Sequence, residues 1–253
     1  MLNWELMWES VPDLLGGLVV TVELTLASLV LGMLLALPLT ALRTARSPIL
    51  WAPAYGYITF FRGTPLLVQI FLIYYGTGQF DWIKATPLWP ILREASWCAI
   101  IAFSLNTAAY TAEILRGAIQ AVPRGEIEAA MSLGMSRFLV FRLVALPRAF
   151  RIALPAYGNE VILVLKSSSL ASTITLLDIT GVARTLVAHT YAPYEIFLVA
   201  GALYLALTFV TTRILAGVEY WLSPERRAAE DQGIRSAAAS ALPPRTGQSA
   251  LGQ

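Results

Sequence analysis

The sequence predicts an all-α protein that crosses a membrane several times and folds as one helical bundle. Of its 253 residues, 57% are hydrophobic and only 13% are charged, and the mean hydropathy is +0.65. A soluble domain carries charges on about a quarter of its residues. Several stretches of about 20 residues contain few or no charges, which is enough to cross a bilayer at about 1.5 Å per residue. Composition therefore excludes a soluble globular domain.

Five apolar segments follow one another along the chain and are the candidate membrane spans. The second is interrupted by the letters FRGTP at 61–65, where glycine and proline disfavour a continuous helix. An odd number of spans places the two chain ends on opposite sides of the membrane. In order, the segments are 14–42, 52–76, 97–119, 151–172 and 194–222.

The distribution of basic residues sets the predicted orientation, because positive charges concentrate on cytoplasmic loops. With the N-terminus outside, the outside segments carry only Lys84, Arg93, Arg184 and Lys166. The inside segments carry more, namely Arg43, Arg46, Arg124, Arg137, Arg142, Arg148, Arg151, Arg226 and Arg227. We therefore predict an N-outside, C-inside bundle at 14–222 that follows an outside segment at 1–13. Residues 223–253 have no apolar period and are predicted to form a disordered cytoplasmic tail.

Several chemistries are excluded by what the chain lacks. The single cysteine, Cys98, has no partner for an internal disulfide, and the single histidine, His189, has no partner for a metal site. A Walker A loop needs Gly-Lys-Ser/Thr, but the two lysines, Lys84 and Lys166, follow isoleucine and leucine. We predict no enzyme activity, metal or cofactor in this chain, and a net charge of +2 gives no reason to expect nucleic acid. Energy for transport must come from a partner or from a gradient.

One charged segment, 123–147, lies between predicted spans on the cytoplasmic side. Pro123 favours the first turn of a short helix, and Gly134 is placed to end that helix in a left-handed conformation. Ser136 is predicted to cap a second short helix, which Pro147 would end. An ordinary amphipathic loop on the membrane surface is the alternative to a docking surface.

The first of these helices has a distinctive surface. Ala129 and Ala130 leave it smooth enough for another chain to approach closely, and Ile127 and Met131 supply apolar anchors four residues apart. These features favour a docking surface for a partner protein.

The order of residues in this segment resembles the EAA loop of ABC importer permeases. That signature is E-A-A, three residues, G, nine residues, then I-x-L-P, and here valine replaces the isoleucine. Other stretches, such as FFRGTPLLVQIFLIYYG and FRIALPAYGNEVILVLKSSSLAS, are similar to the polar amino-acid importers. The nearest resemblance is to the M-type permeases of histidine/lysine/arginine/ornithine and opine importers, and it covers about 14–222. The matching positions are Glu128, Ala129, Ala130, Gly134, Leu146 and Pro147.

The resemblance implies a type I ABC importer permease with five spans in the bacterial inner membrane. It implies that a cytoplasmic ATPase dimer, which binds ATP and Mg, docks on Glu128, Ala129, Ala130, Gly134, Leu146 and Pro147. A sister permease, with a heterodimer favoured, and a periplasmic substrate-binding protein are the other implied partners. The segment 1–13 would then be periplasmic.

Polar residues inside the spans are the candidates for solute contact, because charge at bilayer depth is costly. One face of the third span carries Asn106, Tyr110 and Glu113. This face either lines the solute pathway or forms hydrogen bonds that hold the helices together. Glu160 in the fourth span is predicted to receive a cationic solute; a structural pair with Arg62 or Arg116 is the alternative. The full predicted solute set is Glu160, Asn159, Asn106, Thr64 and Ser167.

Two of these assignments rest on separate arguments. Thr64, in the interruption of the second span, is predicted to present its hydroxyl or its backbone to a solute carboxylate; a plain helix kink is the alternative. Ser167 returns to the face of Glu160 seven residues later. Outside the solute set, Asp178 is predicted to cap a helix rather than contact the binding protein, and His189 is predicted to lie in a loop.

The leading function is a permease subunit of an ATP-driven importer for polar, basic amino acids, and opine or glutamine-type substrates are alternatives within that class. A second class is a gradient-driven carrier or channel that uses Glu113 or Glu160 as a proton relay. A third is a membrane scaffold without a pathway, which would leave Asn106 and Glu160 unexplained.

Overall fold

The computed structural model describes residues 2–222, and every regular element in that range is helical. The predicted tail, 223–253, lies outside the described residues. The long helices are α2 (Val11–Arg43), α3 (Pro48–Gly63), α7 (Ala95–Gln120), α10 (Leu146–Ser167), α11 (Ile179–Thr190) and α12 (Pro193–Leu222). Short α-helices are α1 (Trp4–Glu9), α4 (Leu66–Phe71), α5 (Asp81–Lys84), α6 (Trp89–Leu92), α8 (Arg124–Ser132) and α9 (Arg137–Val140). Wide π turns, η1 (Leu72–Gly76) and η3 (Phe141–Ala145), and tight 3₁₀ turns, η2 (Thr77–Gln79) and η4 (Ser168–Ile174), complete the path.

Three helical stretches are long and apolar enough to cross a membrane unbroken: Trp4–Arg43, Ala95–Gln120 and Pro193–Leu222. Two further candidates are bent pairs, in which Pro48–Gly63 meets Leu66–Gln79 at 104° and Arg137–Ile174 meets Ile179–Thr190 at 46°. Counting each pair as one span gives five, as the sequence predicts. The interruption at 61–65 is a sharp break rather than a plain kink.

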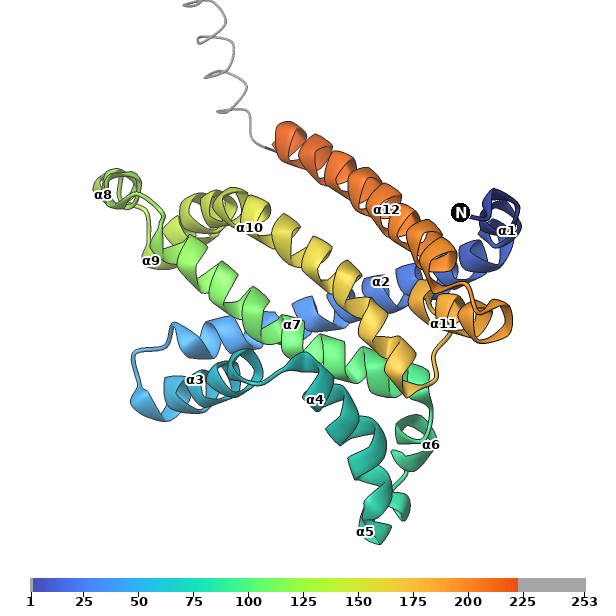
Figure 1. Ribbon diagram of the computed structural model, residues 1–253. Helices are drawn as coiled ribbons and strands as arrows, with labels where there is room; N and C mark the ends of the chain where they lie inside the picture. Colours follow the sequence, from blue (N-terminus) through green and yellow to red (C-terminus); the bar gives the residue numbers. More distant parts are fainter. Residues whose placement is uncertain (1, 223–253) are drawn as a thin grey trace, which may run out of the picture.

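The bundle is built around α2 and α7, which pack against and cross one another, with α3 and α10 on their flanks (Figure 1). Small side chains line the α2 face and allow close approach. A side chain at Gly32 would collide with the methyl group of Thr107, and Ala36 of α2 is buried with Ala109 and Ala112 of α7. Dispersion between tightly packed helices, more than hydrophobic exclusion of water, stabilises such contacts in a membrane.

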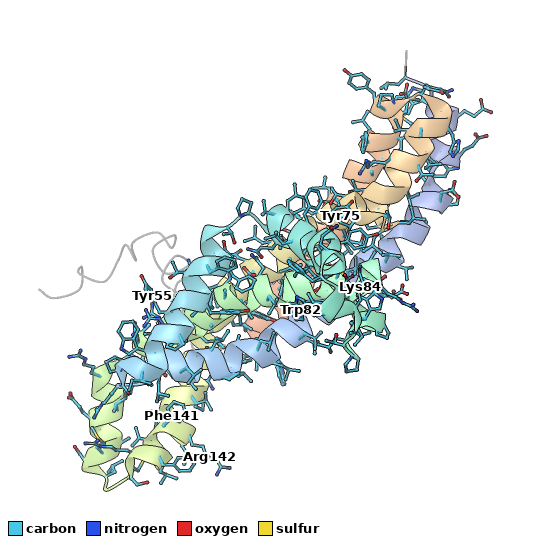
Figure 2. All side chains as sticks on the ribbon, turned by 90° about the horizontal axis from the view of Figure 1, so that it is seen from below. Tyr55, Tyr75, Trp82, Lys84, Phe141 and Arg142 are labelled. Carbon is cyan, nitrogen blue, oxygen red and sulfur yellow. The ribbon has the colours of Figure 1, made fainter. Side chains whose placement is uncertain are left out.

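The two ends of the molecule carry different elements. In Figure 1, α8 and α9 lie at one end, and α1 and α11 lie at the opposite end beside the start of α12. The backbone N–H of Asn3 donates to the Glu195 carboxylate of α12 at 3.3 Å. Figure 2 shows Phe141 and Arg142 at the first end, and Trp82 and Lys84 well away from it.

Three sequence predictions about element boundaries are wrong. Pro147 does not end the second cytoplasmic helix, because the wide turn η3 precedes it and the path continues into α10. The main helix of the fourth span, α10, therefore begins at Leu146, before Arg151. Proline lacks an N–H and its ring crowds the carbonyl four residues earlier, so a widened turn before it relieves both problems. His189 lies in the last turn of α11 rather than in a loop.

The segment before the first predicted span is helical rather than irregular. Asn3 caps α1 by accepting from the backbone N–H of Leu6 at 3.1 Å, and α2 begins at Val11. Leu14, already fully buried, packs with Ile179 and Ile196 of α11 and α12. The start of the chain therefore belongs to the bundle.

Candidate functional site

The chain leaves the helical path between α3 and α4. Gly63 ends α3, and Thr64 and Pro65 are extended, with φ of −113° and −63° and ψ of 145° and 132°. Carbonyl groups at a helix end have no partner within the helix, and at membrane depth they must find one in the protein. The break therefore requires side-chain donors.

Two side-chain amides supply those donors. Nε2 of Gln69 donates to the carbonyls of Phe61 and Thr64, at 2.9 and 3.1 Å, and to the Thr64 hydroxyl at 2.8 Å. Nδ2 of Asn106 donates to the Phe61 carbonyl at 3.1 Å and to Oε1 of Gln69 at 3.0 Å. We name Thr64, Gln69 and Asn106 the amide clip. Because Asn106 belongs to α7, the clip attaches the break to the centre of the bundle.

A cavity of about 320 Å³ opens beside the amide clip. It lies among the break, α7 and the last turns of α10, and its volume suits one small-molecule solute. Its apolar walls carry a few polar groups, which is typical of ligand pockets. The lining residues are Thr64, Pro65, Leu66, Phe103, Asn106, Tyr110, Glu160, Leu163, Val164 and Ser167.

Glu160 is the only acid or base among those lining residues. It is 5% exposed, and Oε1 accepts a hydrogen bond from the Thr107 hydroxyl at 2.7 Å. Within residues 2–222, no lysine or arginine lies within 4 Å of its carboxylate. The structural pair with Arg62 or Arg116 is therefore absent at ion-pair distance. A buried carboxylate without a cation is costly, and a cationic ligand would relieve that cost.

A second charged group lies further along α7. Glu113 accepts from Arg116 at 2.6 Å and lies 3.4 Å from Nε of Arg43, whose guanidinium stacks on Tyr55 at 4.9 Å from the ring centroid. Glu113 is thus held by two arginines from α7 and α2. This pairing favours a structural role for Glu113 over the proton relay of the carrier hypothesis.

Four of the five predicted solute residues line the same cavity, from three segments: Thr64, Asn106, Glu160 and Ser167. Asn159 does not; it is exposed, since adjacent residues on a helix point about 100° apart. The Thr64 hydroxyl donates its proton to the Phe60 carbonyl at 2.8 Å, so it has none to offer a solute carboxylate. Gln69 is the residue that sequence reasoning missed.

At the other end of the molecule, α8 ends as the sequence predicts. Gly134 has φ of +81°, its N–H donates to the Met131 carbonyl at 2.9 Å, and the N–H of Met135 donates to the Ala130 carbonyl at 3.3 Å. This pair of bonds is a Schellman motif, which glycine favours because it has no Cβ. Ser136 caps α9 by accepting from the N–H of Leu139 at 3.4 Å.

Internal contacts attach α8 to the spans. Glu126 lies 3.4 Å from Nε of Arg148 in α10. Ile127 packs inward against Ala118, Ala149 and their neighbours, so it is not the outward anchor that the sequence predicts. Met131 is 43% exposed, as an outward anchor requires. Because of these contacts, a displacement of α8 would also displace α7 and α10.

The remaining predicted coupling residues occupy two places. Glu128 and Ala129 are exposed on α8, whereas Ala130 is buried. Leu146 and Pro147 line a separate apolar cavity of about 610 Å³ with Phe150 and Trp221, between α10 and α12. The motif therefore covers one exposed helix and one helix junction.

A broken-helix bundle with a cavity beside the break and a protruding helix pair has the architecture of the transmembrane permease of a type I importer. The chain belongs to the family described as "Binding-protein-dependent transport system inner membrane component", which matches residues 19–223.

Relatives cover nearly all of the described chain. It is 50% identical to the nopaline transport system permease protein NocM of Agrobacterium fabrum over 225 residues, 88% of this chain and 93% of that one. Identity to the octopine transport system permease protein OccM of Rhizobium meliloti is 51% over 221 residues, 87% and 90% of the two chains. Identity to the arginine ABC transporter permease protein ArtM of Escherichia coli K12 is 45% over 214 residues, 84% and 96%.

Solved structures agree with the fold. A chain of an amino acid ABC transporter crystallised with histidines superposes with a TM-score of 0.79 at 34% identity, covering 87% of this chain and 98% of that one. The MetNI methionine ABC transporter in an inward-facing conformation gives 0.68 at 16% identity over 87% and 99%, which supports the fold alone.

Proposed function

We propose that this chain forms the translocation pathway of an ATP-driven importer for amino acids that carry an extra cationic group. The observation that supports the proposal most directly is Glu160, a buried carboxylate without an ion pair that lines a solute-sized cavity. A guanidinium or ammonium group entering the cavity would form a charge-assisted hydrogen bond with it. Relatives are named for arginine, nopaline and octopine transport. All three compounds carry a guanidinium group.

The proposed assembly follows from the family and from α8. A cytoplasmic ATPase dimer docks on the exposed face of α8, and closure of the ATPases moves α8 together with α7 and α10. The N-terminus is periplasmic and the C-terminus cytoplasmic, in the bacterial inner membrane. A sister permease completes the pathway, and a periplasmic binding protein delivers the solute; ATP and Mg bind to the ATPase. The inward contacts of Glu126 and Ile127 support this proposal, because they make α8 a rigid part of the bundle.

The solute role of Glu160 is tested with Glu160→Gln in the complete transporter. We expect uptake of arginine to fall about ten- to hundredfold, because a charged hydrogen bond is lost, while uptake of a neutral amino acid, where the wild type shows it, is unchanged. Glu94→Gln is the matched control, because the Glu94 side chain is 60% exposed and does not line the cavity. Equal loss for cationic and neutral solutes, or a failure of the complex to assemble, would indicate a structural role instead.

The coupling role of α8 is tested by co-purification of the ATPase. Gly134→Val places a β-branched residue at φ of +81°, where it is strained, and we expect the ATPase to be lost from the purified complex. Gly125→Val is the control, because Gly125 lies in α8, the helix that Gly134 follows, with open space around it and an ordinary φ. If wild-type protein transports amino acids without any ATPase, the gradient-driven carrier is the correct function.

A further inference from the structure

Arg62 lies at the edge of the cavity, next to the break. It is the last basic residue of α3, one position before Gly63, and its guanidinium carbon lies 5.1 Å from the ring centroid of Tyr110. Tyr110 lines the cavity. Arg62 therefore contacts a residue that lines the cavity.

The guanidinium of Arg62 has unused binding capacity. The side chain is exposed, and within residues 2–222 it forms no ion pair within 4 Å and no hydrogen bond. Arginine presents five N–H donors in a planar fork that matches a carboxylate. Stacking on Tyr110 uses the face of the guanidinium and leaves its edge available.

Two carboxylates belong to this region. Glu113 lies within 4 Å of two arginines, Arg43 and Arg116. Glu160 has no such pair. Arg62 and Glu160 are thus the two opposite charges at this cavity that remain without an ion-pair partner.

An amino acid needs both charges. Its carboxylate loses water on entering the cavity, and a buried anion requires a cation as well as hydrogen bonds. Two of the polar lining side chains are already engaged, because Thr64 donates its proton to Phe60 and Asn106 donates to Phe61 and Gln69. None of the described lining residues is a cation.

We propose that Arg62 binds the carboxylate of the amino acid whose cationic group Glu160 receives. The guanidinium turns from the ring of Tyr110 toward the cavity, and the solute bridges the two charges. This inference rests on the proposed function, since it assumes an amino acid at Glu160. It assigns Arg62 to recognition of the carboxylate, the role for which the sequence had predicted Thr64.

The test compares arginine with agmatine, which is arginine without its carboxylate. Direct binding of each radiolabelled compound is measured on the purified permease and ATPase complex, without the binding protein, so that the selectivity is that of the permease. We expect the wild type to bind agmatine at least about tenfold more weakly than arginine. Arg62→Gln should lower arginine affinity to the level of agmatine and leave agmatine affinity unchanged.

A conservative and a matched control variant complete the design. Arg62→Lys should restore part of the arginine affinity, because lysine keeps the charge and loses the fork. Arg213→Gln should change neither affinity, since Arg213 also stacks on an aromatic ring, Phe209 at 4.9 Å, but lies on α12 and does not line the cavity. Unchanged agmatine binding by Arg62→Gln also reports that the variant is folded.

Two other outcomes for Arg62→Gln overturn the assignment of Arg62. An equal fall for both compounds would show that Arg62 acts on Glu160 or on the fold, and no fall for either would show that it does not contact the solute. Glu160→Gln separates the two proposals, because it should weaken both compounds. If Glu160→Gln has no effect while Arg62→Gln weakens arginine alone, the cation site is wrong and the carboxylate site stands. If the wild type binds neither compound, both proposals fail.

Discussion

Each of the two breaks in the helical path leaves backbone polar groups without helical partners, and different side chains bind these groups at each break. Between α3 and α4 the freed carbonyls are bound by neutral amides, whereas before α11 the freed N–H groups are bound by a carboxylate. Asp178 caps α11 by accepting from the N–H groups of Gly181 and Thr180, at 2.9 and 3.3 Å, and from the Tyr204 hydroxyl at 2.9 Å. The first break borders a cavity, while Asp178 is fully buried.

The second break also packs closely against the backbone of helix α2. Thr175 has φ of +74°, which is unusual for a β-branched residue, and Gly17 of α2 lies so close that a Cβ there would be 2.8 Å from the backbone of Asp178. Thr21 of α2 accepts from the N–H of Ile179 at 3.3 Å. We name Gly17, Thr21, Asp178 and Tyr204 the carboxylate knot. The comparison shows that the carboxylate knot joins helices, whereas the amide clip borders a cavity.

The largest expected effect is at the carboxylate knot. Asp178→Ala leaves two N–H groups and the Tyr204 hydroxyl without an acceptor, and we expect it to destabilise the protein by about 4 kcal/mol. The measurement is the thermal unfolding midpoint of the purified protein in detergent. Asp81→Ala is the control, because that side chain is 96% exposed. A midpoint as high as that of the control would mean that the knot does not stabilise the fold.

Next comes the close approach of α2 to the knot. Gly17→Ala places a methyl group against backbone atoms that cannot turn aside, and we expect a loss of about 3 kcal/mol, again measured as the unfolding midpoint. The adjacent Gly16→Ala has open space and should be neutral or stabilising by up to about 1 kcal/mol. Equal midpoints for the two variants would contradict the close contact.

Compared with substitutions in the carboxylate knot, a substitution in the amide clip should destabilise the protein less and weaken solute binding more. Gln69→Leu removes donors from the Phe61 and Thr64 carbonyls, and we expect about 2 kcal/mol of destabilisation, with arginine binding reduced more than tenfold. Unfolding midpoint and radioligand binding are measured on the same preparation. Gln79→Leu, at an exposed position, serves as control. Normal binding by Gln69→Leu would separate the clip from the cavity and abolish the contrast between the two breaks.

The smallest effect is expected at the edge of the knot. Thr21→Val removes one acceptor for the N–H of Ile179, at the long distance of 3.3 Å, which should cost about 1 kcal/mol and leave solute binding unchanged. Thr25→Val is a sharp control, since Thr25 is also buried but its hydroxyl donates only to its own helix. A loss of binding by Thr21→Val would show that the knot also shapes the site.

Local patterns predicted much of this fold. Helical periodicity placed Ser167 and Glu160 on one face, and the left-handed end at Gly134 and the caps at Ser136 and Asp178 followed from residue type. These features depend on neighbours within a few residues, where geometry is nearly fixed.

The errors arise where distant segments meet. Gln69 bonds to the end of α3 only because the chain turns by 104°, and the tyrosine that binds Asp178 lies 26 residues away. The one available signal was a lone amide in the apolar run LLVQIFLIYY, at a depth where polar groups are costly. The prediction that Pro147 ends a helix was wrong because residue types alone do not reveal the widened turn η3.

The wide turn η3 has a consequence for the rotation of α10. A π turn holds one residue more than an α turn, so it absorbs an extra residue without disturbing the helix that follows. If Phe141–Ala145 were wound as an ordinary α-helix, the extra residue would rotate every later side chain by about 100° about the helix axis. Glu160 would then face away from the cavity. The number of residues between Gly134 and Pro147 thus determines the direction in which Glu160, thirteen residues after Pro147, points from α10.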